Sequence, residues 1–155
     1  MLKLKKTHSQ NEDFRNLVAL LDKELAERDG DEHSFYAQYN KVDAIKHVII
    51  AYNDKVPVGC GAIKEYEPGT AELKRMFVHP DYRNMGIAGS MVAVLEQWAV
   101  ELGFTSCILE TGVRQPEAIA LYKKVGYAVT PNYGQYKDVA NSVCMKKRLI
   151  AVLQP

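Results

Sequence analysis

The sequence is poor in cysteine and nearly neutral in charge. Its three cysteines, Cys60, Cys107 and Cys144, are far apart and odd in number, so they match neither a disulfide framework nor a common metal-ligand spacing. Each lies in an apolar segment, where a reduced, buried thiol is the ordinary state, and a reducing cytoplasm fits this usage. The formal net charge of +1 gives no support to bulk electrostatic binding of nucleic acid or of a membrane surface.

Long apolar runs are also absent. No uninterrupted apolar stretch reaches the ~20 residues that a membrane-spanning helix needs, and the opening MLKLKKTHSQ lacks the apolar core of a secretory signal. The basic residues within 3–6 and 146–148 are interpreted as solvated strand ends in preference to a nucleic-acid patch. The 155 residues are enough for one domain, 1–155, with a full hydrophobic core. We expect a cytoplasmic single-domain protein with no metal, nucleic-acid or membrane partner.

Hydrophobic patterning predicts a mixture of strands and helices. Ser9 and Glu12 match a capping box that opens a helix running toward Gly30. Further helices are expected over 32–41, from Gly86 to Gly103 and over 115–125, and strands over 2–8, 47–52, 56–65, 71–78, 104–111, 127–130 and 142–149. The strand–helix–strand passage from 71 to 111 implies a parallel pair, whereas the hairpin from 47 to 65 implies antiparallel pairing. The predicted fold class is α/β (α+β), with a mixed sheet and helices on both faces.

The segment from Arg83 to Gly89 lies where a strand ends and a long helix begins. Amides in the first turn of a helix have no internal partner, and the helix dipole adds partial positive charge there. Gly86 has no Cβ, Ala88 and Gly89 are small, and Arg83 carries a fixed charge that can meet phosphate oxygens. The segment is therefore predicted to hold a pyrophosphate.

Three segments resemble the GNAT superfamily of N-acetyltransferases. They are Leu73 to Pro80 (LKRMFVHP), the turn Arg83-x-x-Gly86-x-Ala88, and Ala118 to Tyr127 (AIALYKKVGY). The expected element order also matches that family's acyl-CoA N-acyltransferase fold, whose central sheet splays apart. The resemblance covers about residues 44–149, and the chain looks like the small, stand-alone bacterial members.

The resemblance implies that acetyl-CoA is bound as a co-substrate. Backbone groups after the middle of the 71–78 strand would bind its pantetheine arm, and an N–H near Met76 or Phe77 would polarise the thioester carbonyl. The residues expected to bind acetyl-CoA are Met76, Phe77, Val78, Arg83, Asn84, Met85, Gly86, Ile87, Ala88 and Gly89.

The resemblance also implies catalytic roles. Tyr122 occupies the general-acid position, where a phenol can protonate the leaving thiolate, although periodicity alone would make it a core aromatic. Glu72 matches the position of a general base in some members, with pairing to Lys74 as the alternative. Glu110 competes with Glu72, since it could orient the amine or receive its proton through water.

The acceptor site is expected to include Glu110, Tyr36 and Tyr133. The predicted function is transfer of an acetyl group from acetyl-CoA to a primary amine of a small molecule, by direct attack in a ternary complex. A non-catalytic acyl-CoA sensor and a protein lysine or N-terminal acetyltransferase are the alternatives. The apolar residues 149–153 suggest burial in the domain or a homodimer. The acceptor loops carry no readable code for the amine.

Overall fold

The computed structural model describes residues 1–29 and 45–149. The helix expected over 32–41, which carries Tyr36, lies outside the described residues, as does the tail after Leu149. Seven strands form one mixed sheet in the order β1-β2-β3-β4-β5-β7-β6. The chain divides into two compact units, here called unit 1 (Met1–Lys64 and Lys74–Leu95) and unit 2 (Glu65–Leu73 and Glu96–Pro155). The single-domain expectation stays a prediction.

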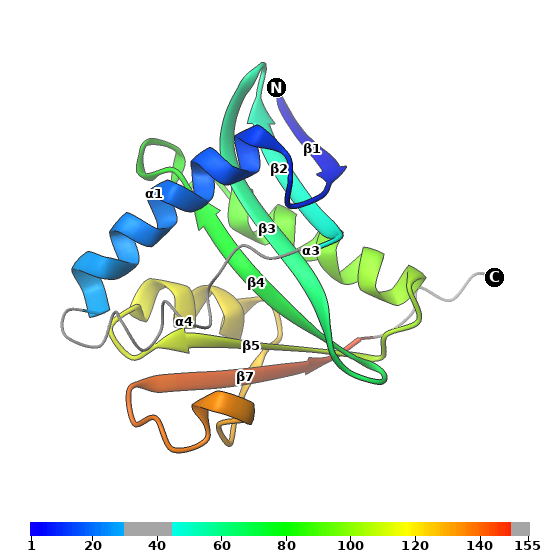
Figure 1. Ribbon diagram of the computed structural model, residues 1–155, viewed down its shortest axis with the longest axis vertical. Coiled ribbons are helices and arrows are strands. Elements are labelled where there is room, and N and C mark those ends of the chain that lie inside the picture. Colours follow the sequence, from blue (N-terminus) through cyan, green and yellow to red (C-terminus); the bar gives the residue numbers. More distant parts are fainter. Residues whose placement is uncertain (30–44, 150–155) are drawn as a thin grey trace. The chain divides into compact units, whose positions relative to one another are not determined.

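The predicted elements that fall in the described ranges are present, with ends within two residues of those expected (Figure 1). The strands are β1 (Leu2–Thr7), β2 (His47–Asn53), β3 (Val56–Glu67), β4 (Thr70–Val78), β5 (Ser106–Gly112), β6 (Ala128–Thr130) and β7 (Ser142–Arg148). The helices are α1 (Glu12–Asp29), α3 (Ile87–Glu101) and α4 (Pro116–Lys124), with the short 3-10 turns η2 (Pro80–Tyr82) and η3 (Gly134–Tyr136). The predicted fold class is confirmed.

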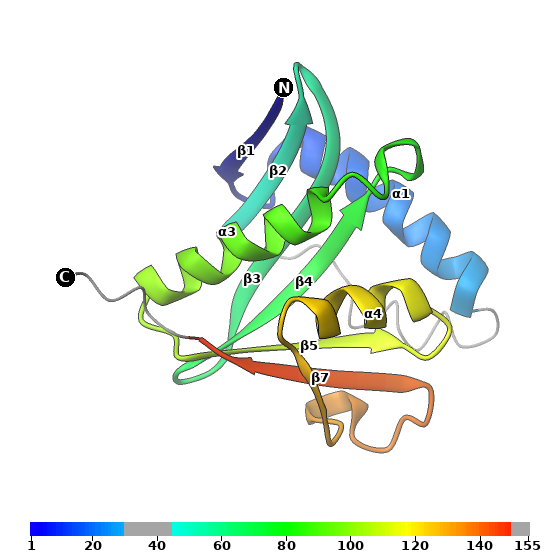
Figure 2. The same ribbon diagram turned by 180° about the vertical axis from the view of Figure 1, so that it is seen from behind.

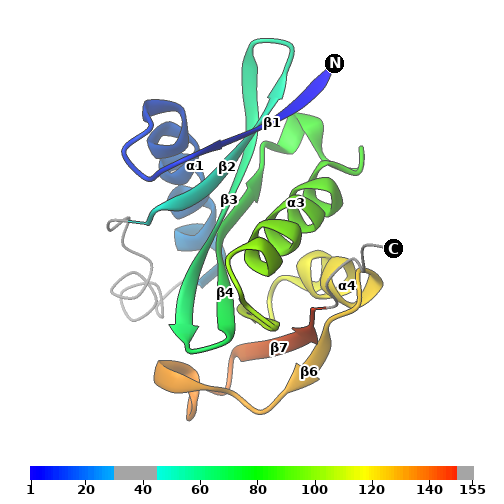
Figure 3. The same cartoon turned by 90° about the vertical axis from the view of Figure 1, so that its right-hand side faces the viewer.

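Unit 1 is an antiparallel sheet covered by helices. β1 pairs with β2, and β2 pairs with β3 through a tight turn at Asp54–Lys55. The apolar face of α1, with Phe14, Leu17 and Leu21, packs on β2, β3 and Phe77 to form a buried core. The first half of α3 lies on the other face of these strands, opposite α1 (Figure 3). Helices on both faces were expected from the mixed order of strands and helices.

The start of α1 differs from the predicted capping box. Asn11 caps the helix, since its Oδ1 accepts a hydrogen bond from the Phe14 amide at 3.2 Å. Ser9 is buried instead, and its Oγ accepts from the Ile45 amide at 3.1 Å. The prediction was wrong because Asn11, which directly precedes the helix, reaches the third helical amide, as a capping side chain must.

Unit 2 contains the parallel pairing expected from the crossover. The beginning of β4 pairs with β5 from Thr70↔Ser106 to Glu72↔Ile108. β5 then pairs with β7 in antiparallel register over its full length, and β6 pairs with β7. In Figure 2, α4 lies on the near side of β5 and β7, whereas η3 lies on their near side in Figure 1, so the two cover opposite faces.

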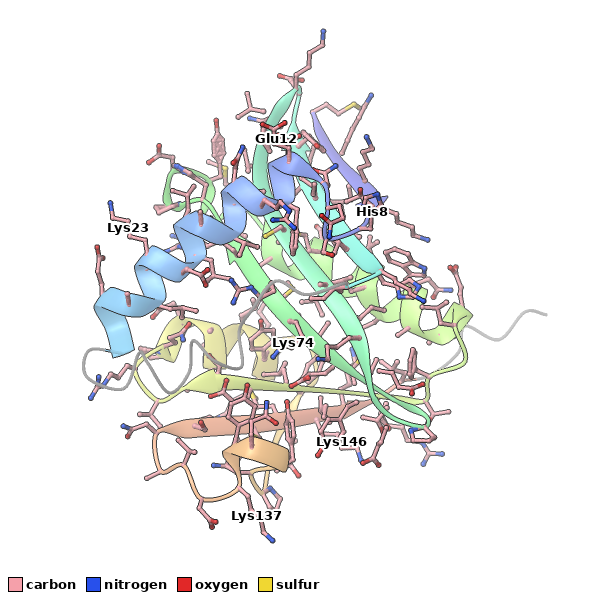
Figure 4. All side chains as sticks on the ribbon, in the orientation of Figure 1. His8, Glu12, Lys23, Lys74, Lys137 and Lys146 are labelled. Atoms are coloured by element: carbon pink, nitrogen blue, oxygen red, sulfur yellow. The ribbon has the colours of Figure 1, made fainter. Side chains whose placement is uncertain are left out.

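The basic run near the end of β7 does not form a continuous surface. Lys146 is exposed on the strand (Figure 4), whereas the contacts of Lys147 place its side chain on the other face. The Lys147 Nζ donates to Glu96 Oε1 at 2.9 Å and to the Val125 carbonyl at 2.8 Å. This alternation follows from the two-residue period of a strand. Over the described ranges, no helix has the length and apolar character needed to cross a membrane.

Candidate active site

Unit 1 carries an open turn between β4 and α3. Asn84 and Gly86 both have left-handed backbone, with φ of 64° and 80°. The Ser90 amide bonds to the Gly86 carbonyl at 3.1 Å, so the amides of residues 87–89 precede the first helical hydrogen bond. Successive amides in such a turn form a concave site for anions, and the start of α3 adds the positive end of its dipole.

The space beside the glycines of this turn is empty of protein. A Cβ built on Gly86 or Gly89 would meet no atom within 4 Å among the described residues. The backbone can therefore be approached as closely as a phosphate oxygen requires, which fits the pyrophosphate predicted here. Met85, at the tip of the turn, is 68% exposed and leaves this approach uncovered.

Arg83 anchors the turn to the rest of unit 1. Its Nε donates to the Val78 carbonyl at 2.8 Å, and one Nη donates to Glu24 of α1 at 2.7 Å. The guanidinium also lies over the Phe77 ring, 5.7 Å from the ring centroid. Arg83 was predicted as a phosphate ligand, and these contacts give it a second role, since they fix the end of β4 against the start of the turn.

The second half of β4 approaches β3 closely. A Cβ on Gly59 would lie 3.0 Å from the Phe77 carbonyl oxygen, and one on Gly61 would collide with the Met76 sulfur. Phe77 and Val78 are buried, and Met76 is half-buried. Glycine at these two positions of β3 therefore lets the segment predicted to bind the pantetheine arm lie close to that strand.

Unit 2 places Glu72 against Tyr133. The Tyr133 hydroxyl donates to Glu72 Oε2 at 2.7 Å, and Glu72 is only 4% exposed. The Tyr133 ring is held edge-on by Tyr66 and Tyr136, with centroids 5.0 and 5.8 Å away. Burial raises the pKa of Tyr133, and the negative charge and hydrogen bond of Glu72 raise it further. Tyr133 therefore stays protonated and keeps the Glu72 carboxylate in one orientation.

Glu110 lies in the same unit on β5. Its Oε2 accepts a hydrogen bond from Ser142 Oγ at 2.8 Å, across the β5–β7 ladder. Burial raises the pKa of Tyr136, and the charges of Glu110 and Glu72 add to this effect. The charges of both carboxylates therefore act on Tyr136, so the two acids predicted as candidate bases lie in one tyrosine-rich neighbourhood within unit 2.

Tyr122 is the buried residue of α4. Its side chain is 7% exposed, and its ring makes an edge contact with Tyr127, with centroids 5.8 Å apart. Its hydroxyl makes no hydrogen bond within the described part of the chain, and the hydroxyl is not completely enclosed by protein. Burial raises the pKa of this phenol, so it carries its proton at neutral pH. These are the properties of an available proton donor, although a buried aromatic also serves the core.

The remaining predicted residues have mixed outcomes. Tyr36 lies outside the described residues. His79, which the sequence placed before Pro80, caps η2 by accepting the Asp81 amide on its Nδ1 at 3.1 Å. Across residues 1–29 and 45–149, no three His, Cys, Asp or Glu side chains gather as a metal site, and the metal prediction stays a prediction.

Sequence reasoning did not identify Tyr66, Ser142 or Glu24. Tyr66 is 67 positions from Tyr133, Ser142 is 32 from Glu110 and Glu24 is 59 from Arg83 along the chain. No local motif signals such contacts, because they arise only when strands and helices pack. Their identification required the tertiary structure.

Comparison with known proteins shows which family this chain matches. The model of the acetyltransferase (GNAT) family matches residues 11–127. A protein of Azospirillum brasilense named IAA acetyltransferase is 39% identical over 102 residues, which are 65% of this chain and 67% of that protein. An uncharacterized N-acetyltransferase of Schizosaccharomyces pombe is 31% identical over 90 residues, 57% of this chain and 55% of that protein. The chain thus spans between about half and two thirds of these relatives.

Solved structures agree with the family. A Klebsiella pneumoniae protein assigned as an acyl-CoA N-acyltransferase has a TM-score of 0.81 and 28% identity, covering 97% of this chain and 99% of that one. The PaiA N-acetyltransferase of Thermoplasma acidophilum, solved with coenzyme A, has a TM-score of 0.71 and 16% identity, covering 96% and 99%. The second likeness shows the fold alone. Because the family model covers most of the sequence, the chain belongs to the acetyltransferase (GNAT) family and is an acetyl-CoA-dependent N-acetyltransferase.

Proposed function

We propose that this enzyme moves the acetyl group of acetyl-CoA to a primary amine of a small molecule, by direct attack of the amine in a ternary complex. The observation that carries this proposal is the Glu72–Tyr133 pair, a buried carboxylate held at 2.7 Å by a phenol in a tyrosine-rich environment. A buried acid of this kind can accept a proton from a bound ammonium group, and the surrounding rings suit a small organic acceptor.

The residues proposed to bind acetyl-CoA are those predicted from the sequence. The amides of residues 87–89 and the open backbone at Gly86 would bind the pyrophosphate, with Arg83 holding the turn in place. Backbone groups of Met76, Phe77 and Val78 would pair with the pantetheine arm. A similar fold from Bacillus anthracis, assigned as a streptothricin acetyltransferase, was solved with acetyl-CoA bound, which supports this choice of co-substrate.

The reaction requires three things of the chain's own residues: they must stabilise an oxyanion, protonate the leaving sulfur and remove a proton from the acceptor. A backbone N–H at Met76 or Phe77 stabilises the oxyanion that forms when the amine nitrogen bonds to the carbonyl carbon. Tyr122 gives its proton to the sulfur as the carbon–sulfur bond breaks, and regains one from solvent. Glu72, directly or through water, takes the proton that the ammonium group loses before attack, and the nitrogen gives up a second proton to solvent as the tetrahedral intermediate collapses, while Glu110 contacts the acceptor. The products are an acetamide and a free thiol.

The acceptor class rests on the acidic, tyrosine-rich character of this neighbourhood. Tyr133 and Glu110, with Tyr36 as predicted from the sequence, would bind the amine substrate. A cytoplasmic location and a homodimer complete the proposal and remain predictions. The relative named IAA acetyltransferase places one small organic molecule, IAA, in the panel of compounds to be tested beside amines.

The test is release of coenzyme A thiol from acetyl-CoA in the presence of amino acids, polyamines, aminoglycosides, lysine peptides or IAA. We expect turnover with one class of small amine. Tyr122→Phe should reduce kcat at least ~100-fold, which is the contribution typical of a positioned general acid. Tyr127→Phe is the matched control, because it also removes a buried phenol hydroxyl, its ring lies beside Tyr122 and the proposed chemistry gives it no role.

The outcomes separate the alternatives. Turnover with lysine peptides alone would replace the small amine by a protein substrate. Binding of acetyl-CoA without turnover on any amine would disprove the proposed reaction. An equal loss in both tyrosine variants would show that loss of a buried hydroxyl in this region slows the enzyme in general, and would contradict a specific role of the Tyr122 hydroxyl as proton donor.

A further inference from the structure

Arg75 has an unusual backbone for its place in the fold. Its φ is 58°, in the left-handed region, although it lies inside β4. The other described non-glycine residues with positive φ, Asp54 and Asn84, lie in exposed turns. A left-handed residue in a strand interrupts the regular ladder and re-aims the peptide that follows it. In this chain the peptide that follows carries the Met76 N–H.

The Arg75 side chain is buried and tied to α1. It is 2% exposed, and its Nη2 donates to Asp22 Oδ1 at 2.6 Å. Its Nε has no hydrogen-bond partner among the described residues, so the pair with Asp22 is the contact that orients the guanidinium. On the backbone side, the Arg75 carbonyl accepts from the Cys60 thiol at 3.4 Å. All of these groups belong to unit 1.

We propose that Arg75 is a positioning residue for acyl transfer, with Asp22 as its partner. A left-handed conformation is unfavourable for a residue with a Cβ and persists only where surrounding contacts impose it. The Arg75–Asp22 ion pair supplies this constraint, because it holds the side chain of the left-handed residue on α1. The direction of the Met76 N–H, which stabilises the thioester oxygen, is set by that residue. This inference rests on the proposed function, since it explains the orientation of the Met76 N–H that the proposed reaction uses.

A comparison of glycine with alanine at position 75 distinguishes this role from ordinary packing. Arg75→Ala removes the ion pair but keeps the Cβ, so the backbone is free to relax to extended geometry. Arg75→Gly also removes the ion pair but tolerates the left-handed conformation without cost. If the side chain acts by holding the backbone, glycine should rescue the alanine variant, although it removes more atoms. Asp22→Asn keeps Arg75 and removes the charge that orients it.

The experiment measures kcat, the KM for the amine and the amide resonances of Met76 and Phe77 in labelled protein. We expect Arg75→Ala and Asp22→Asn to lower kcat about 10-fold or more, with the two amide resonances shifted and the KM for the amine within about 3-fold, as loss of a transition-state contact predicts. Arg75→Gly should recover at least about 5-fold of the kcat lost in Arg75→Ala. Asp54→Ala and Asp54→Gly are the matched controls, because Asp54 has a φ of 55° and is also ion-paired, to the chain's amino terminus at 2.9 Å. Neither should alter kcat or the Met76 resonance.

Two results would overturn the inference. One is a glycine variant as slow as the alanine variant, with both folded. The other is an unshifted Met76 amide in Asp22→Asn, which retains the buried arginine and serves if Arg75→Ala fails to fold. The amide resonances do not depend on turnover. An inactive wild type would therefore disprove the proposed function alone, while shifts in the variants would still report on the role of Arg75 in the backbone.

Discussion

The hydroxyl of Tyr133 can be removed without disturbing its ring. Tyr133→Phe deletes the donor that meets Glu72 Oε2 at 2.7 Å. The phenyl ring keeps its edge contacts with Tyr66 and Tyr136. Glu72 is 4% exposed and is fixed in register opposite Ile108, so neither water nor backbone movement readily replaces the lost hydrogen bond.

The cost follows from the charge and burial of the acceptor. A hydrogen bond to a charged group contributes about 1.5–3 kcal/mol to stability. We therefore expect the free energy of unfolding to fall by about 1.5–3 kcal/mol in Tyr133→Phe. For a chain of this size, the melting temperature should fall by roughly 3–12 °C, at about 2–4 °C per kcal/mol.

Urea denaturation of a double-mutant cycle with Glu72→Gln isolates the pair. The coupling energy between positions 133 and 72 should exceed about 1 kcal/mol, because the two side chains share one interaction. Tyr66→Phe is the control: its side chain is 37% exposed, and the free energy of unfolding should change by less than about 0.5 kcal/mol. A coupling energy below about 0.5 kcal/mol, with all variants folded, would refute the view that Tyr133 holds a buried carboxylate.

Two further predictions concern the turn and the buried thiols. Gly86→Ala should weaken acetyl-CoA binding in calorimetry by about 10-fold or more, or 1.4 kcal/mol. Gly103→Ala should leave the affinity unchanged, although Gly103 has equally open surroundings and a φ of 96°, close to the 80° of Gly86. Equal affinities of the two variants would show that phosphate does not approach Gly86. Burial raises the pKa of Cys60 to about 12 from its ordinary 9.0, so the native state keeps a proton that the unfolded chain releases. Stability should therefore fall above pH 9, by about 1.4 kcal/mol per pH unit from this thiol, and Cys60→Ala should flatten that slope in denaturation curves.

Local patterns were sufficient to predict most of the secondary structure. Pro116 begins α4 and Gly126, with φ of 106°, follows its end, as the preferences of these residues predict. The capping of α1 was less predictable, because Ser9 and Asn11 are both good capping residues by type. The choice between them depends on Ile45, whose amide binds the Ser9 hydroxyl.

The candidate site also has parts that could be predicted from local sequence and parts that could not. The turn around Gly86 was predicted because its function depends on backbone, on a missing Cβ and on the start of a helix, all of which are local properties. The partners of Glu72 and Arg83 were not, because Tyr133 and Glu24 are 61 and 59 positions away from them. The left-handed Arg75 was also missed, since arginine has no preference for that conformation and its partner Asp22 is far away in the sequence.

The sequence by itself predicted the order of strands and helices over the described residues, the turn proposed to bind the pyrophosphate and the resemblance to one family. These features rest on periodicity, on glycine positions and on three short motifs. The tertiary structure decided which acid is held by which tyrosine, what anchors Arg83 and why an arginine adopts a glycine-like backbone in β4. The physical reason is that burial and side-chain pairing depend on residues that meet only after the chain has folded, and no short-range pattern encodes those meetings.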